Sequence, residues 1–221
     1  MMFVHEYLCA LAEECKCILD QNFLGVYAVG SYSMDGYEHG KSDVDVLVVC
    51  KEKLSLPVKQ TLVRNLSHDT IPCPAQKLEL VVYAREGLSQ GYFEINFNSG
   101  STSKEHVCFD YTLEQPHWFV IDREIARHHA KVIIGVDPKE LLTPVPKHTL
   151  VEALLMCLEW HRENRKIAGD RNYFGNAARA LYWTRNNTWI TKSKATKWYK
   201  ENYNDQDRVM DIAIEEVKKC L

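Results

Sequence analysis

Short apolar runs rich in β-branched residues recur along the first half of the chain. They cover residues 24–29, 43–50 and 77–83, and outside their few acidic positions the apolar side chains follow one another without alternation. Continuous runs of this length are typical of strands that are buried on both faces of a sheet. The pattern therefore predicts three strands within a buried sheet.

Apolar positions at helical spacing separate and follow these runs. The first twenty residues, residues 58–66 after Pro57, and residues 118–129 each place apolar side chains three or four positions apart. This spacing lines one face of a helix, and proline is favoured in a helix's first turn. We therefore expect a helix in each of these segments.

Beyond residue 146 nearly the whole pattern is helical. Breaks that contain Gly, Asn or Asp separate four predicted helices, over residues 149–165, 172–185, 192–202 and 205–219. Helices joined by such short breaks form a small bundle. Two prolines make residues 141–147 the expected linker. The predicted fold class is α+β (α/β), with one domain at residues 1–146 and a helical domain at residues 147–221.

Composition places the chain among soluble globular proteins. Of its 221 residues 46% are hydrophobic and 26% are charged, enough to bury a core. The apolar stretches fall far short of the roughly 20 residues that span a bilayer, and the N-terminus lacks the basic start of a secretory signal. Eight cysteines without a C-x-x-C pair favour reduced, buried thiols over disulfides or zinc. We expect a cytoplasmic protein.

The two predicted domains differ in charge. Residues 1–146 carry 13 basic and 20 acidic side chains, whereas residues 147–221 carry 14 basic and 10 acidic ones. Chance placement of solvated charges explains such a split. It is also the split expected if the acidic part holds a metal or a cationic substrate and the basic part meets an anion such as a triphosphate.

The candidate chemistry lies in residues 30–49, GSYSMDGYEHGKSDVDVLVV. Residues two apart in a strand point to the same face, so Asp43 and Asp45 would project side by side. Mg²⁺ compensates such adjacent charges, because it prefers carboxylate ligands together with substrate phosphates. Gly30 would let the backbone approach a phosphate, and the Ser31 hydroxyl would donate to it. Each signal alone is also typical of a solvated turn, but their combination is more specific.

Glu79 adds a third carboxylate within the apolar run Leu78-Glu79-Leu80-Val81-Val82. A strand buried on both faces rarely tolerates an acid without a partner. If this strand pairs beside the one that carries Asp43 and Asp45, Glu79 joins them as a metal ligand or general base. The alternative is an edge-strand glutamate that faces water.

These motifs resemble the nucleotidyltransferase fold of the DNA polymerase beta superfamily, and in particular the aminoglycoside adenylyltransferases that modify streptomycin and spectinomycin. The resemblance rests on residues 30–49 and the strand around Glu79. It continues, in order, through segments that resemble the family's helical C-terminal domain: residues 132–150, 168–172, 179–182 and 191–198. The resemblance implies a mixed sheet flanked by helices in the first domain and covers most of the chain.

The resemblance also assigns roles to single residues. It implies that Asp43 and Asp45 bind metal, that Glu79 is the general base and a metal ligand, and that Gly30 and Ser31 form the phosphate-binding turn. The positions that contact the nucleotide from the helical domain are Arg179 and Lys192, with Lys194 as the alternative to Lys192, and the positions near the aminoglycoside are Asp170 and Asn172.

The reaction that the resemblance implies is the transfer of AMP from Mg-ATP to a hydroxyl group of an aminoglycoside-like cationic acceptor, which would confer antibiotic resistance. We expect Mg²⁺, as two ions, and ATP as co-substrate, with the chain acting as a monomer. Around residues 167–172 the chain is one residue short of the family pattern, and the tryptophan and aspartate that bind streptomycin have no match. Streptomycin is therefore disfavoured as the acceptor.

Two other functions remain open. One is a nucleotidyltransferase that acts on a protein or on the end of an RNA. RNA is disfavoured because nucleic-acid binders usually carry a basic patch, whereas the net charge here is −3. The other is a non-catalytic nucleotide-binding module that kept the fold. The presence of Ser31 and all three carboxylates argues against it. No partner in a membrane or in nucleic acid is expected.

Overall fold

The computed structural model describes residues 3–101 and 104–221, and the chain divides into two compact units. The first unit comprises residues 1–115 and 123–144, and the second comprises residues 116–122 and 145–221. The second unit thus includes residues that the sequence placed in the first domain, because the ring of Trp118 packs edge-on against those of Trp160 and His161. The predicted domain limits at residue 146 stay a prediction.

The first unit is built on a six-stranded mixed sheet with the strand order β5-β4-β3-β2-β1-β6. The strands are β1 (Phe23–Ala28), β2 (Val44–Cys50), β3 (Leu78–Ala84), β4 (Ile95–Ser99), β5 (His106–Cys108) and β6 (Lys131–Gly135). Strands β2 and β3 run parallel, and every other neighbouring pair is antiparallel. The three predicted strands and the α+β fold class are confirmed.

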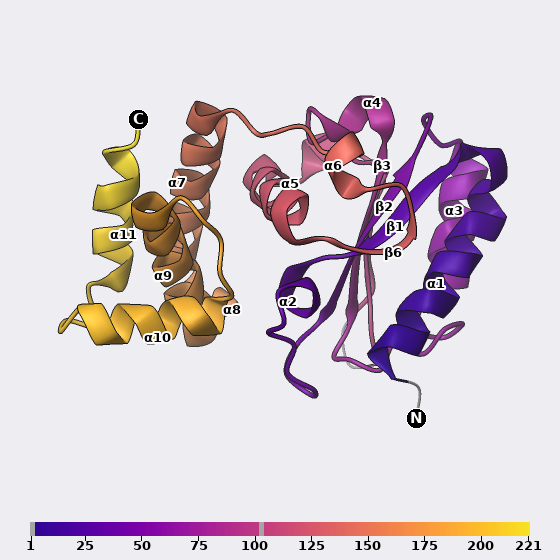
Figure 1. Ribbon diagram of the computed structural model, residues 1–221. Helices are drawn as coiled ribbons and strands as arrows, with labels where there is room; N and C mark the ends of the chain where they lie inside the picture. The colour runs from indigo at the N-terminus through magenta and orange to yellow at the C-terminus, as the bar shows by residue number, and fades with distance from the viewer. Residues whose placement is uncertain (1–2, 102–103) are drawn as a thin grey trace. The chain divides into compact units, whose positions relative to one another are not determined.

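Helices α1 (Val4–Leu19) and α3 (Leu56–Leu66) lie side by side against one face of this sheet (Figure 1). Helix α3 supplies the crossover that a parallel pair of strands requires, since it connects β2 to β3. The core between the layers contains Leu8, Leu11, Val48 and Leu80, each at most 1% exposed. Burial of these side chains fixes the register of the central strands.

The first unit also contains elements that the sequence did not reveal. Strand β6 lies in a segment whose resemblance pointed to the helical domain, yet Val132 pairs with Tyr27 of β1. It is an edge strand with mostly exposed positions, so its apolar run is short and gives no clear period. Strand β4 follows strict alternation, with Ile95 and Phe97 buried. The short helices are α2 (Gly30–Ser33), α4 (Arg85–Leu88) and α6 (Pro138–Leu141), with 3₁₀ turns η1 (Asp20–Asn22) and η2 (Tyr111–Leu113).

The second unit is helical, as predicted. Its helices are α7 (Lys147–Glu163), α8 (Arg165–Ala168), α9 (Asp170–Asn186), α10 (Lys192–Asn202) and α11 (Val209–Lys218), together with the start of α5 (Pro116–His129). The prediction located α7, α9 and α10 within a few residues. It missed the one-turn helix α8 and began the last helix at residue 205, whereas α11 begins at Val209.

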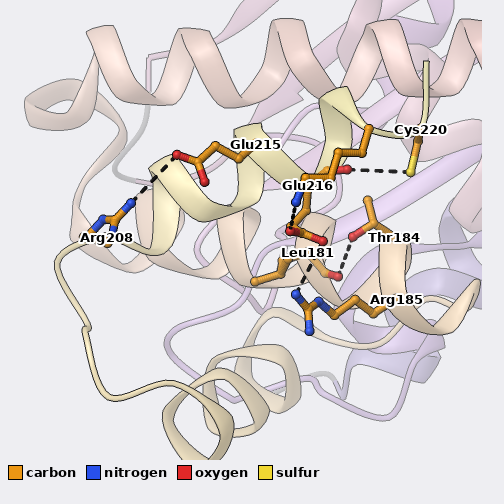
Figure 2. Close-up of polar contacts among 8 residues, drawn as sticks. Leu181, Thr184, Arg185, Arg208, Glu215, Glu216 and Cys220 are labelled. Carbon is orange, nitrogen blue, oxygen red and sulfur yellow. Dashed lines mark hydrogen bonds and ion pairs between the residues drawn. The ribbon is translucent and has the colours of Figure 1, made fainter.

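Ion pairs and buried rings hold the helices of this unit together. Arg185 of α9 contacts Glu216 of α11, with 3.4 Å between Nη2 and Oε2 (Figure 2). Lys219 contacts the same glutamate. The rings of Trp183 and Trp189 stack with 5.6 Å between centroids and are buried. Both tryptophans therefore serve packing. No helix within the described residues is long and apolar enough to span a membrane.

Candidate active site

The three predicted carboxylates gather at one end of β2 and β3. The parallel register places Asp45 directly opposite Glu79, and Asp43 immediately precedes β2. All three residues are partly exposed. The expectation that the two acid-bearing strands are neighbours is confirmed. Because like charges on facing positions repel, this arrangement requires a compensating positive charge.

Lys77, which directly precedes β3, supplies positive charge to this group. Its ammonium forms an ion pair with Glu79 and lies 3.9 Å from Oδ2 of Asp43. Burial alone would lower the pKa of Lys77, but the negative charges of Glu79, Asp43 and Asp45 outweigh that effect and raise it. The sequence reasoning missed this lysine. Its position two residues before Glu79, on the same face of an extended segment, was the available signal.

Gly30 brings the backbone against the same carboxylates. The Val29 amide donates a 3.0 Å hydrogen bond to the Asp45 carbonyl, so the end of β1 is tied to β2. Gly30 then adopts φ +59°, and a Cβ atom at this position would overlap the carboxylate of Asp45. Only glycine fits here. Ser31 follows in the single turn α2, so the structure places the predicted phosphate turn next to Asp45.

The chemistry of these side chains suits a divalent cation. Asp43, Asp45 and Glu79 offer hard carboxylate oxygens, and the ion pairs of Asp43 and Glu79 with the Lys77 ammonium show that the site attracts positive charge. Within residues 3–101 and 104–221, however, no group of three or more His, Cys, Asp or Glu side chains is arranged to hold a metal ion. One or two carboxylates, with the remaining ligands from water or substrate, are the usual protein contribution to a Mg²⁺ site.

In the helical unit, the candidate cation Arg179 belongs to α9, and Lys192 is the first residue of α10, which contacts α9. The Lys192 ammonium donates a 2.9 Å hydrogen bond to Oδ1 of Asn172, one turn before Gly175. A Cβ atom at Gly175 would lie 2.9 Å from Cβ of Lys192, so the absence of a side chain at Gly175 allows the lysine side chain to pack against α9. Arg179 donates to Oδ1 of Asn176 at 3.1 Å. One face of α9 thus orients both cations.

Asp170 stands at the start of the same helix and contacts a different cation. Its Oδ1 lies 2.7 Å from Nε of Arg165, and its side chain is 81% exposed. Asn172, two residues on, accepts from Lys192 and donates to the Ala168 carbonyl at 3.1 Å. The structure therefore joins Asn172 to Lys192, whereas Asp170 is paired with Arg165. Lys194 is exposed, and its amide caps α10 through the Thr191 hydroxyl.

Comparisons with known proteins add to this geometry. No family model matches the chain. The spectinomycin 9-adenylyltransferase of Campylobacter jejuni is 23% identical over an alignment of 191 residues, and the alignment covers 83% of this chain and 73% of that enzyme. A solved structure of the spectinomycin adenyltransferase AAD(9) from Enterococcus faecalis, with ATP and spectinomycin, matches with a TM-score of 0.69.

The solved structure covers nearly the whole chain. The match includes 99% of this chain and 90% of the AAD(9) chain at 19% sequence identity, a level at which the likeness establishes the fold. The chain thus resembles aminoglycoside adenylyltransferases in sequence and in fold, as residues 30–49 predicted. Both similar proteins are adenylyltransferases, in agreement with the prediction that the chain is a nucleotidyltransferase enzyme.

Proposed function

We propose that the protein transfers AMP from Mg-ATP to a hydroxyl group of a small cationic acceptor of the aminoglycoside class. The observation that carries this proposal is the placement of Asp45 opposite Glu79, with the backbone of Gly30 against the Asp45 carboxylate. A carboxylate pair beside a glycine turn suits phosphoryl chemistry, in which charge neutralisation and positioning supply most of the rate enhancement. The two similar adenylyltransferases support the same reaction.

The carboxylates would have two different roles at the reacting phosphorus, metal binding and proton transfer. Asp43 and Asp45 would hold Mg²⁺, which when bound polarises phosphoryl oxygens and neutralises developing charge. Glu79 would accept the proton of the attacking hydroxyl, provided that it lies within about 3 Å of that group in the complex. The ion pair with Lys77 holds the Glu79 side chain at the end of β2 and β3 where the carboxylates gather. Attack on the α-phosphorus would release pyrophosphate.

Backbone and basic groups would bind the triphosphate. Gly30 allows phosphate oxygens to approach the chain closely, and the Ser31 hydroxyl would donate a hydrogen bond. Arg179 and Lys192 would neutralise phosphate charge, each held by an asparagine on α9. The guanidinium presents paired donors, whereas the ammonium acts as a compact charge.

The charge distribution and the similar proteins support a cationic acceptor. The net charge of residues 1–146 is −7, from 13 basic and 20 acidic side chains. Asp170 would contact an ammonium group of the acceptor, in exchange for its exposed ion pair with Arg165, and Asn172 would contact a neighbouring hydroxyl. An exposed ion pair contributes little to stability, so this exchange costs little. Spectinomycin is the acceptor to test first.

The test is pyrophosphate release by the full chain with Mg-ATP and a panel of spectinomycin, streptomycin and a hygromycin-like compound. We expect release with one acceptor, foremost spectinomycin, and none without acceptor. Asp69→Asn is the matched control for Asp45→Asn, because Asp69 is an exposed aspartate of the same unit. Silence across the panel would overturn the proposed acceptor. Labelling of a protein or RNA in a lysate with radioactive ATP would then favour the alternative acceptors.

A further inference from the structure

The interior of the helical unit contains a polar chain that ends on Arg179. His161 of α7 is 3% exposed and Asn176 of α9 is 8% exposed. Nδ1 of His161 lies 2.8 Å from the Cys157 carbonyl oxygen, and its Nε2 lies 2.8 Å from Nδ2 of Asn176. Oδ1 of Asn176 accepts the 3.1 Å hydrogen bond from Nη2 of Arg179. The two buried side chains therefore connect the α7 backbone to the guanidinium.

The two ends of this chain fix the direction of every hydrogen bond in it. A guanidinium can only donate, so Asn176 must present its oxygen to Arg179 and its NH₂ group to His161. A carbonyl oxygen can only accept, so Nδ1 of His161 must carry the proton that faces Cys157. Nε2 is then left as an acceptor for Asn176. The chain is fully satisfied only when His161 is neutral and in its Nδ1–H tautomer.

The surroundings of His161 keep the ring neutral and in place. Burial lowers the pKa of His161, and the positive charges of Lys192 and Arg179 lower it further, although the bond to the Cys157 carbonyl acts in the opposite direction. The rings of Trp118 and Trp160 pack edge-on against the imidazole at 5.3 and 5.1 Å between centroids. The ring therefore has little freedom to turn.

We infer that His161 and Asn176 are positioning residues that hold the Arg179 guanidinium in one orientation for the triphosphate of ATP. This inference rests on the proposed function, because Arg179 has a nucleotide to contact only if the protein binds one. A rotamer-rich arginine loses conformational freedom when it binds phosphate. Because a buried amide already restricts the arginine in the free protein, less conformational freedom is lost when ATP binds. His161 and Asn176 thus act through Arg179 and need not touch ATP.

The alternative is that the buried pair serves only the packing of α7 against α9. Asn176→Leu removes both hydrogen bonds, and an Arg179→Met background separates the two roles. A packing defect would weaken ATP binding in that background as well, whereas a lost anchor has no further effect once its guanidinium is absent. Asn176→Asp accepts from His161 only when Nε2 carries a proton, so it raises the pKa of His161 and tests the direction of the hydrogen bonds.

The experiment measures the Kd of Mg-ATP by calorimetry for the full chain and its variants, after thermal unfolding confirms that each is folded at the assay temperature. We expect Asn176→Leu to weaken ATP binding about tenfold. In an Arg179→Met background, Asn176→Leu should change the Kd less than about twofold, because its target is gone. An equal loss in both backgrounds, or no loss in the parent, would overturn the inference.

Nitrogen NMR of the histidine rings tests the chain without ATP, with the His161 signals assigned by their loss in His161→Phe. We expect the Nδ1–H tautomer at neutral pH and a raised His161 pKa in Asn176→Asp. A protonated ring or the Nε2–H tautomer in the parent would overturn the inference. Failure of the parent to bind Mg-ATP with this NMR pattern intact would instead overturn the proposed function.

Discussion

The carboxylates at the end of the sheet and the cations of the helical unit are held by different kinds of contact. Asp45 and Glu79 are placed by strand register and are balanced by Lys77, an opposite charge. Arg179 and Lys192 are oriented instead by neutral asparagine amides on one face of α9. An ammonium can be exchanged for another cation, whereas an amide leaves the charge of a guanidinium available to an anion. The first arrangement suits metal binding and the second suits phosphate binding.

The largest loss of activity is expected from a substitution at the end of the sheet that carries the carboxylates. Asp45→Asn removes a charge from the proposed metal site but keeps the shape of the side chain. We expect pyrophosphate release with Mg-ATP and acceptor to fall by at least about 100-fold, since metal-assisted neutralisation is worth several kcal/mol. Steady-state kinetics measures the loss, and Asp69→Asn should retain full activity. Activity within a few fold of the parent would remove Asp45 from the reaction.

A smaller effect on ATP use is expected in the helical unit, where either Lys192 or Lys194 would contact the triphosphate. Lys192→Met should raise the KM for ATP about tenfold with a lesser effect on kcat, because a charge-assisted contact to phosphate is lost. Lys194→Met is the control, since that side chain is exposed. If Lys194→Met causes the larger rise in KM, the assignment of Lys192 is wrong.

Lys77 provides a test of the opposite-charge arrangement through stability. Lys77→Gln leaves Asp43, Asp45 and Glu79 without their internal ammonium, so we expect the free energy of unfolding to fall by about 1 kcal/mol in EDTA. Added Mg²⁺ should raise the Tm of this variant more than that of the parent, because the cation replaces the missing charge. Equal shifts in both proteins would show that Lys77 does not compensate the carboxylates.

The helical unit should lose stability in mild acid because of its buried histidines. Burial, and then the cost of a second positive charge beside His161, lower the pKa of His117 to about 4, and burial lowers that of His161. Both stay neutral in the folded chain while the unfolded chain takes up protons below about pH 6.5. Their stabilising contribution is thus complete above that pH and is lost as the pH falls toward about 4.

Thermal unfolding between pH 7.5 and 5 measures this loss as a falling Tm. His117→Phe should flatten the pH dependence, whereas the exposed His39→Gln should leave it unchanged. A slope that is the same in all three proteins would mean that other groups determine the acid sensitivity.

The sequence predicted elements and residues whose signal is local. The continuous apolar runs of β1, β2 and β3 located the central sheet, and the two-residue spacing of Asp43 and Asp45 placed the acids on neighbouring positions. The edge strands β5 and β6 escaped detection because they are short and exposed. Arg179 and Lys192 were assigned by resemblance alone, since a single cation on an amphipathic helix has no distinctive pattern.

Contacts between residues that are far apart in the sequence could not be predicted from it. Lys77 reaches Asp43 only because β2 and β3 pair in parallel. His161 and Asn176 are 15 positions apart and meet only when α7 packs against α9. His161 is buried, and its directed hydrogen bonds appear only in the folded unit.

Mass spectrometry of the acceptor after incubation with the full chain and Mg-ATP tests the proposed function most directly. With spectinomycin as acceptor, we expect a product whose mass is raised by one AMP unit, together with one pyrophosphate per product. Asp45→Asn should yield no such product, and Asp69→Asn should yield as much as the parent. ATP binding without any adenylylated acceptor, from spectinomycin or the other panel members, would contradict the proposed transfer to a small cationic molecule.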